Sequence, residues 1–349
     1  MTHIPLNAHD LNTLLQVSCL TLLVLVCILL IKHARAGLNT WAGIGLTACV
    51  ICYLILETPF VQSNHLLFLI ALTGSISVPV LFFLLTKAIF DDHFQPGWNI
   101  LGWFALEIVP HFWIYLRGLI AIDDTLLQVT HIISEIVSLG FVLAGLYVAV
   151  KTRKSDLVES RLRFRNTFIL VTALIIGITL IVEALPIARE STDVLQVIQR
   201  SSIVMLTLYF IVSNVEVKSG FFFKEIPKEK PVVLEDTQLR AKLDSLIQEK
   251  KIYKKEGLTI GELAELMGEQ EYRLRRLING ELGFRNFNDF LNQYRVNEAC
   301  EVLSDPSQNR KTVLEIAYSL GYQSIGPFNK AFKELKGTTP TAFRKLPKS

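Results

Sequence analysis

Charged residues are scarce in the first part of this chain. Residues 1–213 hold only 12 of the 35 Lys and Arg residues and 13 of the 32 Asp and Glu residues. The whole chain of 349 residues is nevertheless 51% hydrophobic, with a mean hydropathy of +0.40. This composition excludes an ordinary soluble protein. It indicates a membrane-spanning part, residues 1–213, followed by a charge-dense part, residues 214–349, in which Lys and Arg slightly outnumber Asp and Glu.

Cysteine is also scarce, and its distribution excludes a disulfide framework. Cys19, Cys27, Cys49 and Cys52 lie in apolar runs, and Cys300 lies in a charged, helix-like segment. Cys49 and Cys52 formally make a C-x-x-C motif. Two packed thiols inside a membrane span are the favoured interpretation, and a redox or metal pair is the alternative.

The charge-dense part lacks the usual patterns of catalytic chemistry. It contains no Cys/His metal spacing, no glycine loop that would hold a phosphate and no nucleophile elbow. We therefore expect neither an enzyme nor a cofactor or metal site.

Seven runs of residues are apolar enough to cross a bilayer, which takes about 20 residues. The second run is short, and Gln196, Gln199 and Arg200 interrupt the seventh. The sequence thus predicts an all-α fold with a seven-helix transmembrane bundle. The runs are Leu11–Ile31, Trp41–Leu56, Leu66–Phe90, Trp98–Leu116, Leu126–Val150, Phe168–Leu185 and Val194–Val212.

Basic residues in the loops predict the orientation of these spans. Alternate loops hold nine Lys and Arg residues against two, or against three if Arg200 is counted with the sixth loop. Cytoplasmic loops carry the excess, so the amino terminus is expected outside and residues 214–349 in the cytoplasm. The first span has no basic residue before it and no small-residue cleavage site, so it does not read as a removed signal peptide.

Residues 214–235 are interpreted as a linker between the membrane domain, residues 1–213, and a cytoplasmic domain, residues 236–349. Pro227 and Pro231 prevent a continuous helix there. A helix is then expected from Thr237 to Lys250, with leucines and an isoleucine on one face. This helix could pack on the domain that follows or pair with another copy of the chain.

Two copies of one pattern follow at a fixed offset of 53 residues. The first runs from Thr259 to Gly268 and the second from Thr312 to Gly321, and Thr, Glu, Ala and Gly recur at matching positions. Threonine caps a helix, alanine allows a second helix to cross closely, and glycine allows the positive-φ turn that ends the first helix. The two copies therefore predict two helix-turn-helix units.

These residues resemble the AraC/XylS family of bacterial transcription regulators, and among its members the membrane-bound type with an N-terminal multi-span region. The resemblance does not extend to the membrane part. It implies two helix-turn-helix units joined by a long helix, here Asn286–Leu303, each placing one recognition helix in the major groove of double-stranded DNA. The matching residues are Phe287, Phe290, Tyr294-Arg295-Val296, Ala299, Ile316-Ala317, Gly321-Tyr322, Phe328, Lys330, Phe332-Lys333, Gly337, Pro340 and Phe343-Arg344.

The first recognition helix is predicted at Glu271–Asn279, with its arginines outward and Leu274, Leu277 and Ile278 inward. The resemblance implies that Tyr272, Arg275 and Arg276 touch bases and that Arg273 lies nearer the backbone. Arginine suits guanine edges and phosphates alike. A solvated basic helix face is the alternative. The acidic start, Glu269-Gln270-Glu271, departs from the family pattern and puts a backbone contact there in doubt.

In the second recognition helix Ser324 is the expected cap and Pro327 falls in the first turn. Asn329 and Lys330 are expected to point outward, whereas Lys333 is expected to contact phosphates. Ser324 is included with these three as a DNA-contacting candidate. Gly326 stands where many relatives have a polar side chain, so this helix is expected to read fewer bases.

Ionisable residues within the predicted spans are candidates for sensing, because such groups are costly in a bilayer. Glu107 and His111 lie one turn apart in the fourth span, and His131 and Glu135 do so in the fifth; Glu183 is near the end of the sixth. A polar site open to the outside would suit a ligand or protons. The alternative is interhelical pairs that hold the bundle together, for example Glu183 with Arg200.

The sequence therefore favours a one-component transcription regulator of the bacterial cytoplasmic (inner) membrane. Its expected partners are double-stranded DNA, the lipid bilayer, an unknown extracytoplasmic or membrane ligand and, as an option, a second copy of the chain. One alternative is a membrane transporter or membrane enzyme with a fused regulatory DNA-binding domain. Another is a passive anchor without sensing.

Overall fold

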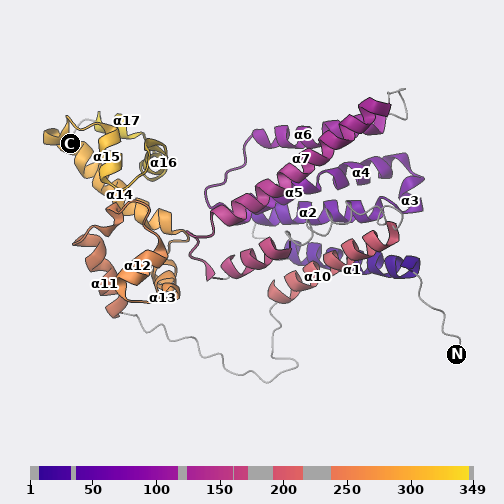
Figure 1. The fold of residues 1–349 in the computed structure, drawn as a ribbon, viewed down its shortest axis with the longest axis horizontal. Helices are drawn as coiled ribbons and strands as arrows, with labels where there is room; N and C mark the ends of the chain where they lie inside the picture. The colour runs from indigo at the N-terminus through magenta and orange to yellow at the C-terminus, as the bar shows by residue number, and fades with distance from the viewer. Residues whose placement is uncertain are drawn as a thin grey trace, which may run out of the picture. The chain divides into compact units, whose positions relative to one another are not determined.

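The computed structural model describes residues 8–32, 37–116, 124–159, 161–171, 192–214 and 237–345. Within these ranges the regular structure is helical, which confirms the predicted all-α class, and strand-like pairing is confined to one bridge between Asp156 and Asn286. The chain forms two compact units (Figure 1). The first comprises Met1–Lys151 and Asn166–Glu225, and the second Thr152–Arg165 and Ile226–Ser349.

The first unit is a bundle of apolar helices (Figure 1). Some of the helices that pack together are neighbours in the sequence, and others are far apart in it. α10 packs on α1, α1 on α2, α2 on α4 and α5, α5 on α7, and α7 on α6. The helices are α1 (Ala8–Lys32), α2 (Leu38–Ile55), α3 (Pro59–Gln62), α4 (His65–Ile76), α5 (Val78–Phe90), α6 (Asn99–Leu116), α7 (Asp124–Lys151) and α10 (Thr192–Asn214).

The predicted number of seven spans is not confirmed. Over the described residues three helical stretches are long and apolar enough to cross a membrane, namely Asp10–Lys32, Leu38–Ile55 and Gln128–Lys151. A fourth is added if α4 and α5 together make one span, and Gln196–Val212 is a shorter apolar helix. Most of the predicted sixth span, up to Leu185, lies outside the described residues.

The predicted span Leu66–Phe90 is broken in the middle. α4 and α5 meet at Ser77 with a bend of 46°. Pro79 lies in the first turn of α5, where it has no N–H to continue the hydrogen-bond ladder of α4 and its ring crowds the preceding turn. The Thr73 carbonyl before the break accepts from the Ser77 hydroxyl at 2.7 Å and from the Ser77 N–H at 3.2 Å.

The second unit holds both helix-turn-helix copies and one segment from earlier in the chain. That segment, Thr152–Arg165, is called the 152–165 segment below; its last residues belong to a helix over residues 161–171. The other elements are α11 (Thr237–Gln248), a 3₁₀ turn (Ile252–Lys254), α12 (Ile260–Met267), α13 (Glu271–Arg276), a π-helical turn (Leu277–Glu281), α14 (Phe287–Ser304), α15 (Val313–Ser319), α16 (Ile325–Lys336) and α17 (Pro340–Arg344).

Two apolar cores share the long helix α14. Its first half supplies Phe287 and Phe290 to a core with α11, α12 and α13, and its second half supplies Val296 and Ala299 to a core with α15 and α16. α11 buries Leu239, Leu243 and Ile247 in the first core, so packing on the following domain, one of the two options left open by the sequence, is what this structure shows. The single helix α14 thereby joins the two helix-turn-helix units within the second compact unit.

The domain boundary differs from the one expected at residue 213. The sequence assigns the whole of residues 1–213 to the membrane domain, whereas the 152–165 segment is part of the second compact unit. The linker residues 215–235, with Pro227 and Pro231, lie outside the described residues.

Candidate nucleic-acid interface

Both predicted helix-turn-helix copies begin with the expected threonine cap. The Thr259 hydroxyl accepts from the backbone N–H of Glu262 at 3.2 Å, and the Thr312 hydroxyl accepts from that of Glu315 at 3.1 Å. In the second copy the Glu315 carboxylate also accepts from the Thr312 N–H at 2.7 Å, which completes a capping box. These bonds hold the pKa of Glu315 below its ordinary value. The caps fix where each first helix starts.

In both copies a glycine with positive φ lies in the turn after the first helix. Gly268 has φ +67° and Gly321 has φ +83°, in the region that favours glycine. A Cβ on Gly268 would meet nothing within 4 Å, whereas one on Gly321 would lie 2.3 Å from the carbonyl oxygen of Lys254. The second turn glycine is therefore required by packing as well as by backbone conformation.

Arg295 ties the two helix-turn-helix units together from the middle of α14. Its guanidinium donates from Nε to the carbonyl of Tyr253 at 2.6 Å and from Nη2 to that of Lys255 at 3.0 Å, and it lies 5.1 Å from the centre of the Tyr322 ring. Burial lowers the pKa of Arg295 and raises that of Tyr322 to about 12. The sequence singles out Arg295 only as part of the family resemblance, and its clamping role comes from the structure.

The first recognition helix has the predicted inner face, but its outer face differs in part, because the Arg275 side chain, which was expected to point outward, is only 12% exposed. Leu274, Leu277 and Ile278 are buried, and Tyr272 is 60% exposed. Arg276 is exposed and has no ion-pair partner in the part of the chain that the structure describes. The helix is shorter than predicted, because the α-helical turns end at Arg276 and a π-helical turn follows to Glu281.

The acidic start of this helix engages its arginines. Glu269 pairs with Arg273 and also accepts from Lys242 Nζ at 2.9 Å. Glu271 pairs with Arg275, whose Nε donates to Glu271 Oε1 at 2.9 Å. Both arginine pairs have the i,i+4 spacing of helix ion pairs. The departure from the family pattern therefore lowers the free positive charge of this helix and leaves Arg276 as its unengaged arginine.

The second recognition helix, α16, buries Phe328, Ala331 and Phe332 and exposes the opposite face. Asn329 and Lys330 are exposed as predicted, and so is Lys333. Ser324 occupies the N-cap position but makes no capping hydrogen bond with its side chain, so its hydroxyl is left for another partner. Lys330 lies 3.8 Å from Glu334, a loose pair that leaves the ammonium group accessible.

The structure describes the side chains of three of the five residues predicted to form a sensing site in the membrane domain. Glu107 is buried in α6, and its Oε1 accepts from the Ser138 hydroxyl of α7 at 2.5 Å. His111 Nδ1 lies 2.8 Å from the carbonyl oxygen of Glu107, on its own helix. Glu135 is on the exposed side of α7. The side chain of His131 and all of Glu183 lie outside the described residues, so the convergence of these groups stays a prediction.

Arg200 of α10 bonds two residues from other parts of the bundle, and its suggested partner Glu183 lies outside the described residues. Its Nη2 lies 3.3 Å from Glu57 Oε2, and its Nη1 donates to the side chain and carbonyl of Asn12 at 2.7 and 3.0 Å. Gln196 bonds the same Asn12 and Glu57. This network joins the ends of α1, α2 and α10 and explains the polar residues in the seventh apolar run.

Residues 263–346 match the helix-turn-helix domain family. The matched range starts within α12, covers both recognition helices and supports an AraC/XylS-type DNA-binding domain in the C-terminal region. No curated protein and no solved structure gives a significant match to the chain.

Proposed function

We propose that this chain is a membrane-integrated one-component transcription regulator whose C-terminal domain binds specific DNA sequences. One observation carries the proposal: two capped helix-turn-helix units share α14 and each exposes one side of a recognition helix. Arg276 and Tyr272 are available on α13, and Asn329 and Lys330 on α16. These are side chains that reach base edges in the major groove.

The location and the control of this activity are part of the proposal. Among the described residues, three or four helices that are long and apolar enough to cross a membrane precede the domain, which supports anchoring in the bacterial cytoplasmic membrane with the DNA-binding domain in the cytoplasm. We place the signal in the membrane domain, where Glu107 is buried with one carboxylate oxygen lacking a hydrogen-bond partner among the described residues. We further propose that the chain has no catalytic activity. A second copy of the chain is a candidate partner.

One observation favours a second candidate, a transporter with a fused DNA-binding regulator. Broken apolar helices are typical of transporters, and α4 and α5 are an apolar helix pair bent by 46°. Transporter folds repeat this feature in two halves of the sequence. The described residues contain one bent pair, so the regulator is the better-supported function.

The full-length chain in lipid nanodiscs tests the DNA-binding activity. It should enrich duplexes from a random-sequence pool that carry two half-sites about one DNA turn, roughly 34 Å, apart. Binding should weaken steeply with salt, because phosphate contacts release counterions. A double variant, Arg276→Ala with Asn329→Ala, removes one reader from each recognition helix and should lose the enriched motif. Failure of the unchanged chain to enrich any sequence would contradict the proposed function.

A further inference from the structure

The 152–165 segment is built into the apolar core of the first helix-turn-helix unit. It follows α7 directly in the chain and continues into the helix over residues 161–171. Leu157 is 2% exposed and belongs to the same core as Leu274 of the recognition helix and Phe287 of α14. A connection between two apolar helices thus supplies a core residue to a domain that begins some 70 residues later in the chain.

Backbone hydrogen bonds fasten this segment just before α14. The N–H of Phe287 donates to the carbonyl of Ser155 at 2.8 Å, and the N–H of Leu157 donates to the carbonyl of Arg285 at 3.0 Å. These two bonds flank the antiparallel bridge between Asp156 and Asn286. An extended piece of chain held by main-chain bonds and one apolar anchor uses the same chemistry as a bound peptide strand.

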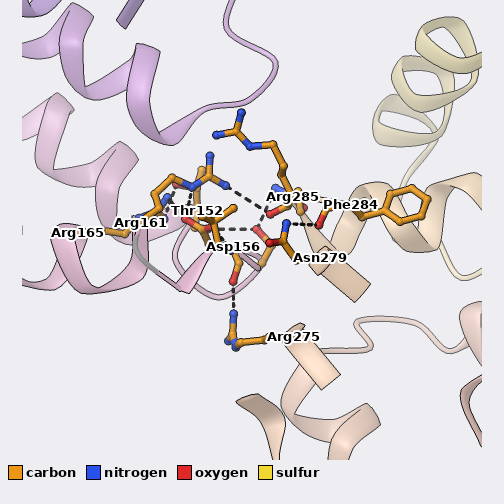
Figure 2. Close-up of polar contacts among 11 residues, drawn as sticks. Thr152, Asp156, Arg161, Arg165, Arg275, Asn279, Phe284 and Arg285 are labelled. Atoms are coloured by element: carbon orange, nitrogen blue, oxygen red, sulfur yellow. Dashed lines mark hydrogen bonds and ion pairs between the residues drawn. The ribbon is translucent and has the colours of Figure 1, made fainter. Parts of the chain in front are cut away.

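The side chain of Asp156 forms ion pairs with two arginines of the same segment. Its carboxylate lies 2.7 Å from both Arg161 Nε and Arg165 Nη2, and Arg165 also donates to the Thr152 hydroxyl at 2.9 Å (Figure 2). All three ionic groups are buried. The internal ion pairs hold the turn rigidly, so that the backbone carbonyl of Asp156 is presented to the recognition helix.

Arg275 donates from Nη1 to this carbonyl (Figure 2). Its remaining donors bond Glu271, and its side chain is only 12% exposed. A carbonyl oxygen is also what an arginine fork meets at the O6 edge of guanine. The segment therefore binds Arg275, one of the residues expected to touch bases, while the neighbouring Arg276 stays exposed.

We propose that the 152–165 segment is an intramolecular competitor of DNA for the first recognition helix. When docked, it holds Arg275 on the carbonyl of Asp156; when released, it frees Arg275 for a base. The inference rests on the proposed DNA-binding function and names how that site is regulated. Because the segment is continuous with α7 and with the helix over residues 161–171, a displacement of those helix ends changes whether it stays docked.

A reversible crosslink tests the competition. Asp156 and Asn286 face each other between two ladder bonds, a position in which Cα atoms are typically about 4.5 Å apart and within reach of a disulfide. The variant Asp156→Cys with Asn286→Cys is prepared as the full-length chain in nanodiscs. Its probe is a fluorescent duplex enriched by that same chain in reduced form. Oxidation should weaken binding by about tenfold or more, the value of one arginine–base contact, and reductant should restore it.

The oxidised and reduced forms differ only in the crosslink, so a general folding defect cannot imitate the effect. Each single cysteine variant should bind equally in both redox states, which controls for the five native cysteines. Equal affinity of the crosslinked and reduced forms would overturn the competition while leaving the DNA-binding function standing. Failure of the two thiols to crosslink, together with rapid hydrogen exchange of the Leu157 and Phe287 amides in the unchanged, DNA-free chain, would overturn the docking. Absence of any sequence-specific binding, even in the reduced form, would remove the proposed function as well.

Hydrogen exchange on the unchanged chain gives a second, mutation-free measurement. Saturating duplex should speed exchange of the Leu157 and Phe287 amides, which the docked segment protects, and slow exchange within α13. A release variant, Leu157→Ala, should bind the duplex more tightly than the unchanged chain. Its matched control is Leu162→Ala, a half-buried leucine of the same segment. Continued protection of both amides in the DNA complex would show that docking and DNA binding are compatible, which contradicts the proposal.

Discussion

Among single residues, Arg276 is the recognition-helix arginine that is exposed and free of ion pairs among the described residues. We expect Arg276→Ala to relax discrimination at one base position and to cost roughly 1–3 kcal/mol of binding free energy. Lys333→Ala, at an expected phosphate contact, should weaken binding about equally on all sequences and reduce the salt dependence. Affinities over a set of single-base variants of the enriched duplex measure both. Unchanged sequence preference in Arg276→Ala would remove this residue from the readout.

The two turn glycines are expected to differ in their tolerance of a side chain. Gly268→Ala places a residue at positive φ in open space and should lower the free energy of unfolding by about 1–2 kcal/mol. Gly321→Ala adds a clash with the carbonyl of Lys254, and overpacking of this kind costs a further ~1–3 kcal/mol. Denaturant unfolding of the two variants measures the difference. Equal losses would show that the second turn can shift to make room.

At the scale of elements, the capping box of α15 should make this helix sensitive to acid. The pKa of Glu315 is lowered in the folded state by its bonds to Thr312, so its contribution to stability is full above the ordinary glutamate pKa of about 4.3. That contribution is lost as the pH falls through the lowered, folded-state pKa. Melting temperatures between neutral pH and pH 3 should therefore drop more for the unchanged chain than for Glu315→Gln. Parallel profiles would contradict this assignment.

α14 explains why the two helix-turn-helix units form one body. Its two halves enter different cores, and Arg295 joins the turn before α12 to the turn between α15 and α16. A rigid connection of this kind fixes the separation of the two recognition helices. Both can then meet the same face of a duplex without the entropy cost of two flexibly linked readers.

For the whole molecule, the orientation in the membrane is a separate prediction. Reporter fusions after Asn39, Asp92 and Ser155 should report the cytoplasm, and fusions after Gln62 and Asp123 the exterior. The physical reason is the excess of Lys and Arg in alternate loops. The fusion after Ser155 bears directly on the 152–165 segment, which must be cytoplasmic to contact a DNA-binding domain. An exterior signal at Ser155 would contradict both the topology and the docking.

Signalling is also a property of the whole chain, and α7 offers a path for it. This helix carries Ser138, the partner of Glu107, and ends at Lys151, directly before the 152–165 segment. Glu107→Gln and Glu135→Gln should uncouple transcription from the signal while protein abundance and DNA affinity in nanodiscs stay unchanged. Promoter reporters and immunoblots of the same cells measure this. Loss of abundance alone would show that these carboxylates are structural.

The elements that could be predicted from the sequence are those that a few neighbouring residues specify. Threonine caps, turn glycines and the apolar faces of α11 to α16 follow from spacing along a few helical turns, so the two helix-turn-helix units were predicted in place. The number of spans was less secure, because an apolar run does not show a break such as the one at Ser77.

Contacts between residues far apart in the chain could not be predicted from the sequence. The burial of Leu157 among residues of α11 to α14, the contact of Arg275 with the Asp156 carbonyl and the pairing of Arg200 with Asn12 and Glu57 all join residues more than eighty positions apart. No local pattern encodes such contacts, since each depends on how packed helices bring backbone and side-chain groups to the same point. The group that accepts the hydrogen bond from Arg275 is a main-chain carbonyl, which every residue has. Its position therefore comes from the fold and not from the type of residue.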